Sequence, residues 1–314
     1  MNTTKDEKMK LLITGVAGQL GHDVMIEGVS RGHYCIGSDV ADYTAAQFTN
    51  GDAPFDSIIY EKLDITDKDA VEEVINTIHP DAIIHCAAWT AVDAAEDEKN
   101  KTKVQAINVE GTRNIAEAAK STNSKLLYLS TDYVFDGQGT RPWQPDNKNY
   151  APLNYYGLTK LEGEKAVTSV LEKWYVVRIA WVFGLNGKNF IKTMINVGKT
   201  HPEVRVVDDQ IGTPTYTKDL ARLLVDMVET EKYGYYHATN EGGFISWADL
   251  AEEAYSAAGM DVKVNRVSTA AYGASIAKRP MNSRLDKSKL VEAGFTPLPE
   301  WKDAVRRYVA EAKL

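Results

Sequence analysis

The sequence predicts an α/β protein with a doubly wound, mostly parallel sheet and a smaller C-terminal lobe. Short apolar runs alternate with segments of helical spacing from Lys10 to Trp181. The first run leads directly into a glycine-rich turn at residues 15–21, and the alternation stops after Gly184. Strands that alternate with helices are joined by crossover connections, which place them parallel in one sheet. These observations indicate a Rossmann-type fold.

The strands are expected where the apolar runs lie. Their ranges are Lys10–Thr14, Tyr34–Ser38, Tyr60–Asp64, Ala82–Ala87, Lys125–Ser130, Trp174–Trp181 and Val262–Val267.

Helices are expected where apolar residues recur every three or four positions. In the segment Asp67–Ile78, for example, Val71, Val74 and Ile75 share one face. Ser246 is a suitable N-cap for the helix that follows it. The predicted helices cover the residues after Gly15 through Val29, then Asp67–Ile78, Val104–Ala119, Tyr156–Leu171, Trp247–Ala258 and Glu300–Ala312.

Composition excludes several classes of protein. The 314 residues carry a net charge of −8, which argues against nucleic-acid binding, since that requires a basic face. No apolar run is long enough to span a membrane, and the polar N-terminus lacks the apolar core of a signal peptide. The two cysteines, Cys35 and Cys86, lie in apolar runs and are expected to be buried thiols. We therefore expect a cytoplasmic protein with a flexible tail at residues 1–8.

A glycine-rich loop follows the first strand. Gly15, Gly18 and Gly21 have GxxGxxG spacing, with Gln19 and Leu20 between the last two, and the loop opens a helix. Glycines let the backbone approach a diphosphate, while the helix N-terminus offers unpaired N–H groups. This context of strand, loop and helix favours a dinucleotide site; the alternative is a glycine-rich turn without a ligand.

Residues at the ends of the next strands predict the other half of this site. Asp39 can accept hydrogen bonds from the adenosine ribose, which favours NADH over NADPH, because a carboxylate repels the 2′-phosphate. A surface Asp that caps a turn remains the alternative. Asp64 and Ile65 can contact the adenine. Small residues after the fourth strand leave room for the cofactor, although they suit core packing equally well; this segment contains Ala87, Ala88, Trp89 and Thr90.

Tyr156 and Lys160 are the central pair of the predicted site. Positions i and i+4 share one face of a helix, so the ammonium can lie beside the phenol. Lys160 could also hydrogen-bond the nicotinamide ribose, and both residues are expected to contact the cofactor. A neighbouring positive charge lowers the pKa of a tyrosine and prepares it for general acid–base catalysis. Thr131, at the end of the fifth strand, can donate a hydrogen bond to a substrate carbonyl oxygen. Asn108 could hold a water that links Lys160 to solvent, or could be an ordinary polar residue on a helix face.

These motifs resemble the extended short-chain dehydrogenase/reductases, and within them the dTDP-4-dehydrorhamnose reductase family. The matching stretches follow one another over nearly the whole chain: Leu12–Gly21, Ala88–Glu96, Ser130–Gly137, Ala151–Glu164, Arg178–Gly184, Asp209–Thr215 and Lys278–Leu285. The resemblance implies NADH- or NADPH-dependent reduction of the C4 ketone of dTDP-6-deoxy-L-lyxo-4-hexulose to dTDP-L-rhamnose.

The resemblance also implies roles for individual residues. Tyr156 would donate the proton, Thr131 and Asp132 would touch the sugar, and Trp181 would pack on the deoxysugar. Arg279, Asn282, Ser283 and Arg284 would lie near the nucleotide end of the substrate. Since Pro280 follows Arg279, this arginine is expected in a loop, where it could clamp phosphate. The alternative is a plain solvated side chain. Arg178, in the middle of a strand, is interpreted as structural.

Metal, partner and domain expectations complete the prediction. Some family members use Mg2+, but no local carboxylate cluster supports a metal site here. A nucleotide-sugar substrate and a homodimer are expected. The dinucleotide-binding domain should span residues 9–188, with 208–240 returning to it; residues 189–207 and 241–314 should form a substrate-binding lobe.

Three other functions fit the same fold: a dehydratase, an epimerase and a non-catalytic regulatory subunit. In related dehydratases the catalytic Thr is followed by Asp-Glu, whereas here Thr131 is followed by Asp132 and Tyr133, so elimination is disfavoured. An epimerase would keep NAD bound without consuming NADH. A non-catalytic regulatory subunit need not keep Thr131, Tyr156 and Lys160, which are all present.

Overall fold

The structure is a computed structural model that describes residues 8–42, 59–273 and 275–314. The predicted flexible tail at residues 1–8 lies outside the described residues except for Lys8.

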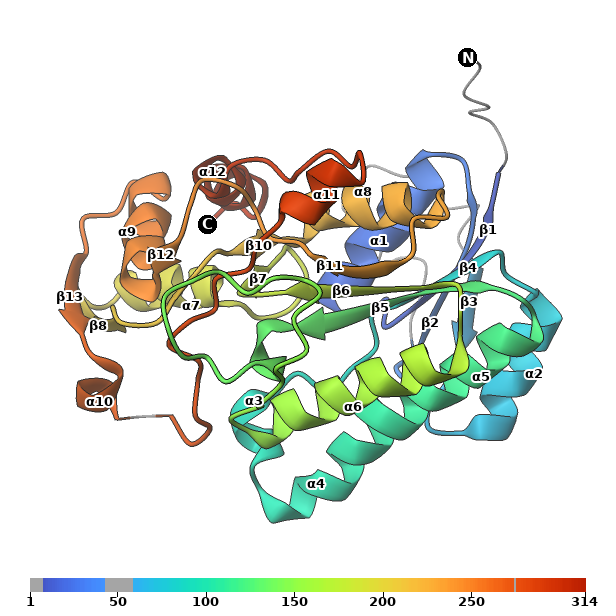
Figure 1. The fold of residues 1–314 in the computed structure, drawn as a ribbon. Coiled ribbons are helices and arrows are strands. Elements are labelled where there is room, and N and C mark those ends of the chain that lie inside the picture. Colours follow the sequence, from blue (N-terminus) through green and yellow to red (C-terminus); the bar gives the residue numbers. More distant parts are fainter. Residues whose placement is uncertain (1–7, 43–58, 274) are drawn as a thin grey trace.

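A seven-stranded sheet forms the centre of the molecule (Figure 1). Its order is β11-β6-β5-β4-β1-β2-β3, and every neighbouring pair is parallel. The chain moves from β1 to one edge and then returns to build the other half, so β1 and β4 flank the point where the strand order reverses. Ligands of such folds bind at the carboxyl ends of the strands beside this point. The strands are β1 Lys10–Thr14, β2 Tyr34–Asp39, β3 Ile59–Lys62, β4 Ala82–His85, β5 Lys125–Thr131, β6 Trp174–Ile179 and β11 Gly234–His237.

Helices cover both faces of this sheet, as the predicted fold class requires. The helices α1 (Gln19–Ser30) and α8 (Thr217–Val228) pack on one face, and α2 (Lys68–Ile78), α5 (Thr112–Ser121) and α6 (Tyr155–Val170) on the other (Figure 1). Each face encloses its own apolar core, because the strands are buried on both sides. The prediction of a doubly wound parallel α/β fold is confirmed.

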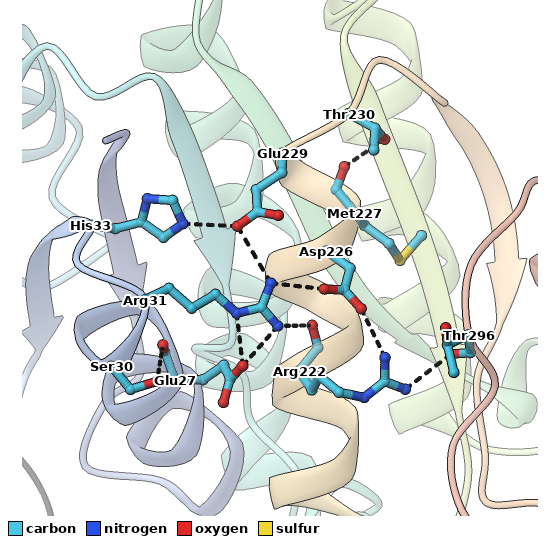
Figure 2. A network of polar contacts seen from close by, with 10 residues as sticks. All are labelled: Glu27, Ser30, Arg31, His33, Arg222, Asp226, Met227, Glu229, Thr230 and Thr296. Atoms are coloured by element: carbon cyan, nitrogen blue, oxygen red, sulfur yellow. Dashed lines mark hydrogen bonds and ion pairs between the residues drawn. The ribbon is translucent and has the colours of Figure 1, made fainter. Parts of the chain in front are cut away.

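A polar seam joins α1 to α8 at their exposed ends (Figure 2). The Arg31 guanidinium donates hydrogen bonds to the carboxylates of Glu27, Asp226 and Glu229. His33 contacts the same Glu229 carboxylate at 2.9 Å. Several charges that share partners hold a geometry better than isolated surface pairs do. The seam therefore fixes α8, which brings the chain back to the sheet at β11.

The predicted helix Val104–Ala119 is longer and less regular than the sequence suggests. It begins as α4 (Glu98–Gln105), continues as a π-helical segment at Ala106–Gly111, and ends as α5. Wider π turns often occur at functional sites, because they re-aim a side chain. Here the π segment contains Asn108, which is buried with 1% of its surface exposed.

The C-terminal elements build a second core beside the sheet (Figure 1). Helix α9 (Trp247–Ala257) begins at the predicted N-cap Ser246, which forms a capping box with Asp249. Helices α7 (Phe190–Gly198) and α12 (Trp301–Glu311) pack around it, and β8 (Glu203–Val207) pairs in parallel with β13 (Lys263–Val267). Short elements complete this region: β7 Val182–Phe183, β9 Ile211–Gly212, β10 Thr215–Tyr216, β12 Ile245–Ser246 and α10 Thr269–Tyr272. Two other short helices lie elsewhere: α3 Val92–Ala95 contacts α4 and α6, and α11 Ser288–Glu292 contacts β11.

The division of the chain into two lobes stays a prediction, although β11 does pair with β6 in the main sheet. None of the described helices is long and apolar enough to cross a membrane.

Candidate active site

A cavity of about 710 Å³ opens at the carboxyl ends of the central strands. It has the size expected of a site for a dinucleotide and a small substrate. Most of the residues predicted to bind cofactor line it: Gly15, Gly18, Gln19, Leu20, Gly21, Asp39, Asp64, Ile65, Ala87, Ala88 and Thr90. The predicted catalytic residues Thr131, Tyr156 and Lys160 line it too, together with Asp132 and Trp181.

The glycine loop needs glycine at two positions. Gly15 has a φ of +73°, and a Cβ there would lie 2.6 Å from the backbone nitrogen of Ala87. A Cβ on Gly21 would lie 2.2 Å from the carbonyl oxygen of Gly15. Neither position accepts a larger residue without a shift of backbone, so the loop keeps α1 close to the ends of β1 and β4.

The N-terminus of α1 suits an anionic ligand. Its N-cap is Gly18, which provides no side-chain hydrogen bond, and its first turn carries no acidic residue. The first backbone N–H groups of the helix are therefore free to bind a diphosphate, and the helix dipole favours negative charge there. These residues fit the dinucleotide that the sequence predicts.

Asp39 and Asp64 reach the cavity from neighbouring strands. One oxygen of Asp39 accepts a hydrogen bond from the N–H of Ala17 at 3.1 Å, so this carboxylate also fixes the glycine loop. Asp64 accepts from both the N–H and the hydroxyl of Thr66, at 2.9 and 2.8 Å. Both aspartates are in the predicted place, and each retains unused acceptor capacity towards a ribose or an adenine.

Trp89 and Asn108 do not line the cavity, in contrast to the other predicted cofactor residues. The amide of Asn108 accepts from the N–H of Trp89 at 2.8 Å and donates to its carbonyl oxygen at 3.2 Å. It also donates to the hydroxyl of Thr159 at 3.0 Å. Asn108 thus ties the loop after β4 to α6, next to Lys160.

Tyr156 is in the first turn of α6 and close to the end of β5. Helix α6 is capped by Asn154, whose side chain accepts from the N–H of Gly157. The Tyr156 hydroxyl forms a hydrogen bond with Thr131, which lowers the tyrosine pKa. Burial and the Asp132 carboxylate act more strongly, however, and raise the pKa of Tyr156 above its ordinary value. A neutral phenol at physiological pH is the form that can donate a proton.

The structure differs from the expectation that Lys160 lowers the Tyr156 pKa. The Lys160 ammonium lies 4.1 Å from the centre of the Tyr128 ring, and no effect of Lys160 on the Tyr156 pKa is resolved. Lys160 is 3% exposed, and burial lowers its own pKa to about 7. Helical spacing correctly predicted a shared face, but it could not predict that the lysine is desolvated.

Asp132 presents a buried carboxyl beside Tyr156. It is 1% exposed, and burial raises its pKa to about 6, while the hydroxyls of Ser283 and Thr131 lower it. The Thr131 hydroxyl donates to Asp132 at 3.0 Å. Asp132 is therefore a carboxyl beside Tyr156 that can accept hydrogen bonds from substrate hydroxyls.

Trp181 forms a flat wall of the cavity in an unusual backbone conformation. Its φ is +51°, which is uncommon for any residue other than glycine. Its ring stacks on Trp247 at 3.9 Å, and a Cβ on Gly212 would lie 3.0 Å from it. Backbone strain of this kind occurs at functional sites, where the surrounding packing maintains it.

The other residues predicted to bind substrate have structural partners. Arg279 forms an ion pair with Asp93 at 2.8 Å, and Asn282 donates to the carbonyl oxygens of Gln138 and Arg141. Arg284 donates to the Asn282 side chain at 3.0 Å. None of Arg279, Asn282, Ser283 and Arg284 lines the cavity. Of this group, Ser283 lies closest to the chemistry, through its contact with Asp132.

Two lysines that the motifs did not identify also line the cavity. Lys103 lies on α4 and Lys188 in the loop before α7, where the Gln19 amide donates to its carbonyl oxygen. Neither lies in a recognisable motif, so the only available signal was a basic residue near a predicted phosphate site. Cys86 also lines the cavity and is half-buried, whereas Cys35 is buried as expected.

Arg178 is structural, as interpreted from the sequence: it is fully buried and pairs with Glu164 at 2.8 Å. Within residues 8–42, 59–273 and 275–314, no group of three His, Cys, Asp or Glu side chains could hold a metal ion.

Comparisons with known proteins agree with this geometry. The family model of the RmlD substrate binding domain matches residues 9–314. A dTDP-4-dehydrorhamnose reductase of Aggregatibacter actinomycetemcomitans is 37% identical over 97% of this chain and 99% of its own. The crystal structure of a dTDP-4-dehydrorhamnose reductase from Clostridium acetobutylicum is 38% identical, covers 98% of this chain and 100% of its own, and gives a TM-score of 0.83. A Bacillus anthracis structure in complex with NADP is 36% identical, covers 97% and 100%, and gives the same TM-score.

Proposed function

The chain belongs to the RmlD substrate binding domain family, and on that premise we propose that it reduces the C4 ketone of dTDP-6-deoxy-L-lyxo-4-hexulose to dTDP-L-rhamnose. It is an NAD(P)H-dependent oxidoreductase of dTDP-rhamnose biosynthesis. The observation that carries the proposal is the meeting of Thr131, Tyr156 and Lys160 in the same cavity as the glycine loop.

The geometry assigns a task to each of these residues. A bound nicotinamide supplies the hydride, and the glycine loop with the N-terminus of α1 would hold its diphosphate. Tyr156, neutral because burial raises its pKa, donates a proton to the C4 oxygen. The Thr131 hydroxyl, which contacts Tyr156, stabilises the negative charge that develops on that oxygen. Protonated Lys160, which lines the same cavity, would donate a hydrogen bond to the nicotinamide ribose.

Substrate recognition follows from the other walls of the cavity. Trp181 offers an apolar surface to the deoxy face of the sugar, and Asp132 accepts from its hydroxyls. Since Arg279 is already paired with Asp93, we do not assign it to phosphate; Lys188, on the cavity wall, is the cation proposed for that task.

We propose that NADH is preferred and NADPH accepted. Asp39 supports the preference, because its carboxylate lines the cavity beside the loop that it fixes. The Bacillus anthracis relative was solved with NADP, so the fold accommodates the phosphorylated cofactor. A homodimer and a cytoplasmic location complete the proposal, and no metal is assigned to the reaction.

The test is to follow NADH or NADPH oxidation with the dTDP-4-keto-L-deoxysugar and to identify the product. We expect stoichiometric oxidation of cofactor and formation of dTDP-L-rhamnose. Turnover of the sugar without net NADH consumption would identify an epimerase. Loss of water from the sugar would identify a dehydratase, and stable capture of a synthetase without any turnover would identify a regulatory subunit.

A further inference from the structure

We propose that Glu164 is a positioning residue for the Tyr156–Lys160 pair: it anchors their helix to the ends of β5 and β6 and presents a carboxylate to the Lys160 ammonium. The inference rests on the catalytic roles proposed above for Tyr156 and Lys160. It concerns a residue that touches neither the cofactor site nor the substrate site directly, since Glu164 does not line the cavity.

Glu164 continues the reactive face of α6. It lies four positions after Lys160 and eight after Tyr156, so all three occupy one side of the helix. That side faces the sheet, and Glu164 is fully buried there. A buried carboxylate without partners is strongly unfavourable, so its partners indicate what it does.

Those partners are at the ends of the two strands that border the reaction site. The Ser130 hydroxyl donates to one Glu164 oxygen at 2.5 Å, and the Arg178 guanidinium donates to both oxygens at 2.8 Å. Ser130 and Arg178 are opposite each other in the β5–β6 register. Thr131, which hydrogen-bonds Tyr156, directly follows Ser130. Glu164 therefore fixes Thr131 and Tyr156 relative to each other through a single buried group.

The same part of α6 is packed too tightly against β5 to be adjustable. A Cβ on Gly163 would lie 2.2 Å from the Tyr128 hydroxyl, and that hydroxyl donates to the carbonyl oxygen of Lys160. In so rigid a contact, a displacement of Glu164 is transmitted to Lys160 and Tyr156.

Glu164 is also the charged group that faces Lys160. Within the part of the chain that the structure describes, the other ionisable groups around the ammonium are His85 and Cys86 at the end of β4, Tyr128 on β5 and Tyr156 on α6. Burial lowers the pKa of His85 to about 3 and raises those of Cys86, Tyr128 and Tyr156, so all four are neutral near physiological pH. Asn108 on the π segment and Thr112 on α5 offer only uncharged groups. Burial has the largest effect on the pKa of Lys160 and lowers it. The carboxylate of Glu164 has the largest opposing effect and raises this pKa.

Arg178 makes this arrangement possible. It is fully buried, and it also donates to the hydroxyl of Tyr150 and the carbonyl oxygen of Pro145. Its guanidinium forms a bidentate pair with the two oxygens of Glu164, which is the geometry of the strongest ion pairs. Removing one member of such a pair leaves the other unpaired, so a loss of stability is expected whatever the role of Glu164. The test must therefore use a measurement that stability alone does not move.

That measurement is the pH profile of kcat/KM, together with the pH dependence of NADH affinity followed by fluorescence without substrate. In the wild-type protein, kcat/KM and NADH affinity should both fall as Lys160 loses its proton, near pH 7 in the free enzyme. In Glu164→Gln the loss should occur at a pH lower by about one unit, because the nearby negative charge is gone. Glu162→Gln is the matched control, since this half-buried carboxylate on the same helix contacts Gln105 instead.

Ser130→Ala tests the anchoring without touching a charge, and it remains informative if Glu164→Gln does not fold. It should lower kcat about tenfold, because a well-positioned acid loses alignment, while NADH affinity and the position of the pH profile stay as in the wild type.

The outcomes are distinct. A wild-type protein without cofactor oxidation would refute the proposed function itself. An active wild type, together with a folded Glu164→Gln variant whose profile superimposes on that of the wild type, would overturn the electrostatic role of Glu164. An unchanged kcat in Ser130→Ala would overturn the anchoring role.

Discussion

The ammonium group of Lys160 lies over the Tyr128 ring, away from bulk solvent. The sequence predicted that Lys160 shares a helix face with Tyr156, because that relation depends only on local geometry. Its burial depends on β4, β5 and the π segment, which come from other parts of the chain. The sequence pattern therefore could not predict that the pKa of Lys160 is lowered to about 7.

Burial of Lys160 has a consequence for stability. Its folded pKa of about 7 is below the ordinary value of 10.5, so between these pH values the unfolded chain binds the extra proton. The free energy of unfolding should then rise with pH across this window. Relative to Lys160→Met, the wild type should gain about 1 kcal/mol per pH unit between pH 7.5 and 9. Denaturant titrations at several pH values measure this difference.

Comparison with Lys165→Met provides the control, because Lys165 is exposed on the same helix and should show no such dependence. Parallel stability profiles for wild type and Lys160→Met would contradict the depressed lysine pKa.

Asp39 determines cofactor choice in our account. Asp39→Ala should raise the efficiency with NADPH relative to NADH by about tenfold, because a carboxylate no longer faces the 2′-phosphate. Steady-state kinetics with both cofactors measure the ratio. Since Asp39 also accepts from the N–H of Ala17, Asp39→Asn is the matched variant that removes the charge but keeps an acceptor. An unchanged ratio in both variants would show that Asp39 does not contact the ribose.

At the scale of elements, the long helix of residues 98–121 shows what periodicity can and cannot predict. Apolar spacing correctly indicated a helix in this region. It did not indicate the π segment at Ala106–Gly111, because one wider turn shifts the pattern only locally. That turn is also where Asn108 points inward to Trp89 and Thr159.

Asn108→Leu should therefore disturb both the fold and the cofactor site. The variant leaves the backbone N–H and carbonyl groups of Trp89 without partners, which should cost about 3 kcal/mol of unfolding free energy. NADH affinity should fall as well, because Ala88 and Thr90 line the cavity on either side of Trp89. Denaturant unfolding and fluorescence titration measure the two effects.

Asn76→Ala, at an exposed amide on α2, serves as the comparison and should change neither quantity by much. Normal NADH affinity in a folded Asn108→Leu variant would refute the link between the π segment and the cofactor.

At the scale of the whole molecule, the parallel sheet followed from local signals, whereas the order of its strands was not predicted. Long apolar runs predicted the strands up to β6, and the parallel arrangement followed from the helices between them. The two-residue strands β7, β9, β10 and β12 were not predicted, because two residues carry no periodicity. Arg279 was expected to clamp phosphate or to be a plain solvated side chain, since the sequence could not show that the fold brings Asp93 to it from 186 positions away.

The Asp93–Arg279 pair joins α3 to the loop that carries Ser283. Breaking it with Arg279→Gln should raise the KM for the nucleotide sugar several-fold and leave kcat nearly unchanged, because the loop loosens while Tyr156 stays in place. Since the pair is partly exposed, its coupling energy in a double-mutant cycle with Asp93→Asn should be only about 1 kcal/mol. A KM equal to that of the wild type would show that the pair does not order this loop.

Proton donation from the Tyr156 phenol to the C4 oxygen is the central step of the proposed reaction. Tyr156→Phe keeps the ring and its edge-on contact with Tyr133, but it removes the hydroxyl. We predict that kcat for reduction of the dTDP-4-keto-L-deoxysugar falls by about 100-fold or more, while NADH binds as in the wild type. A variant that turns over at nearly the wild-type rate would contradict the account.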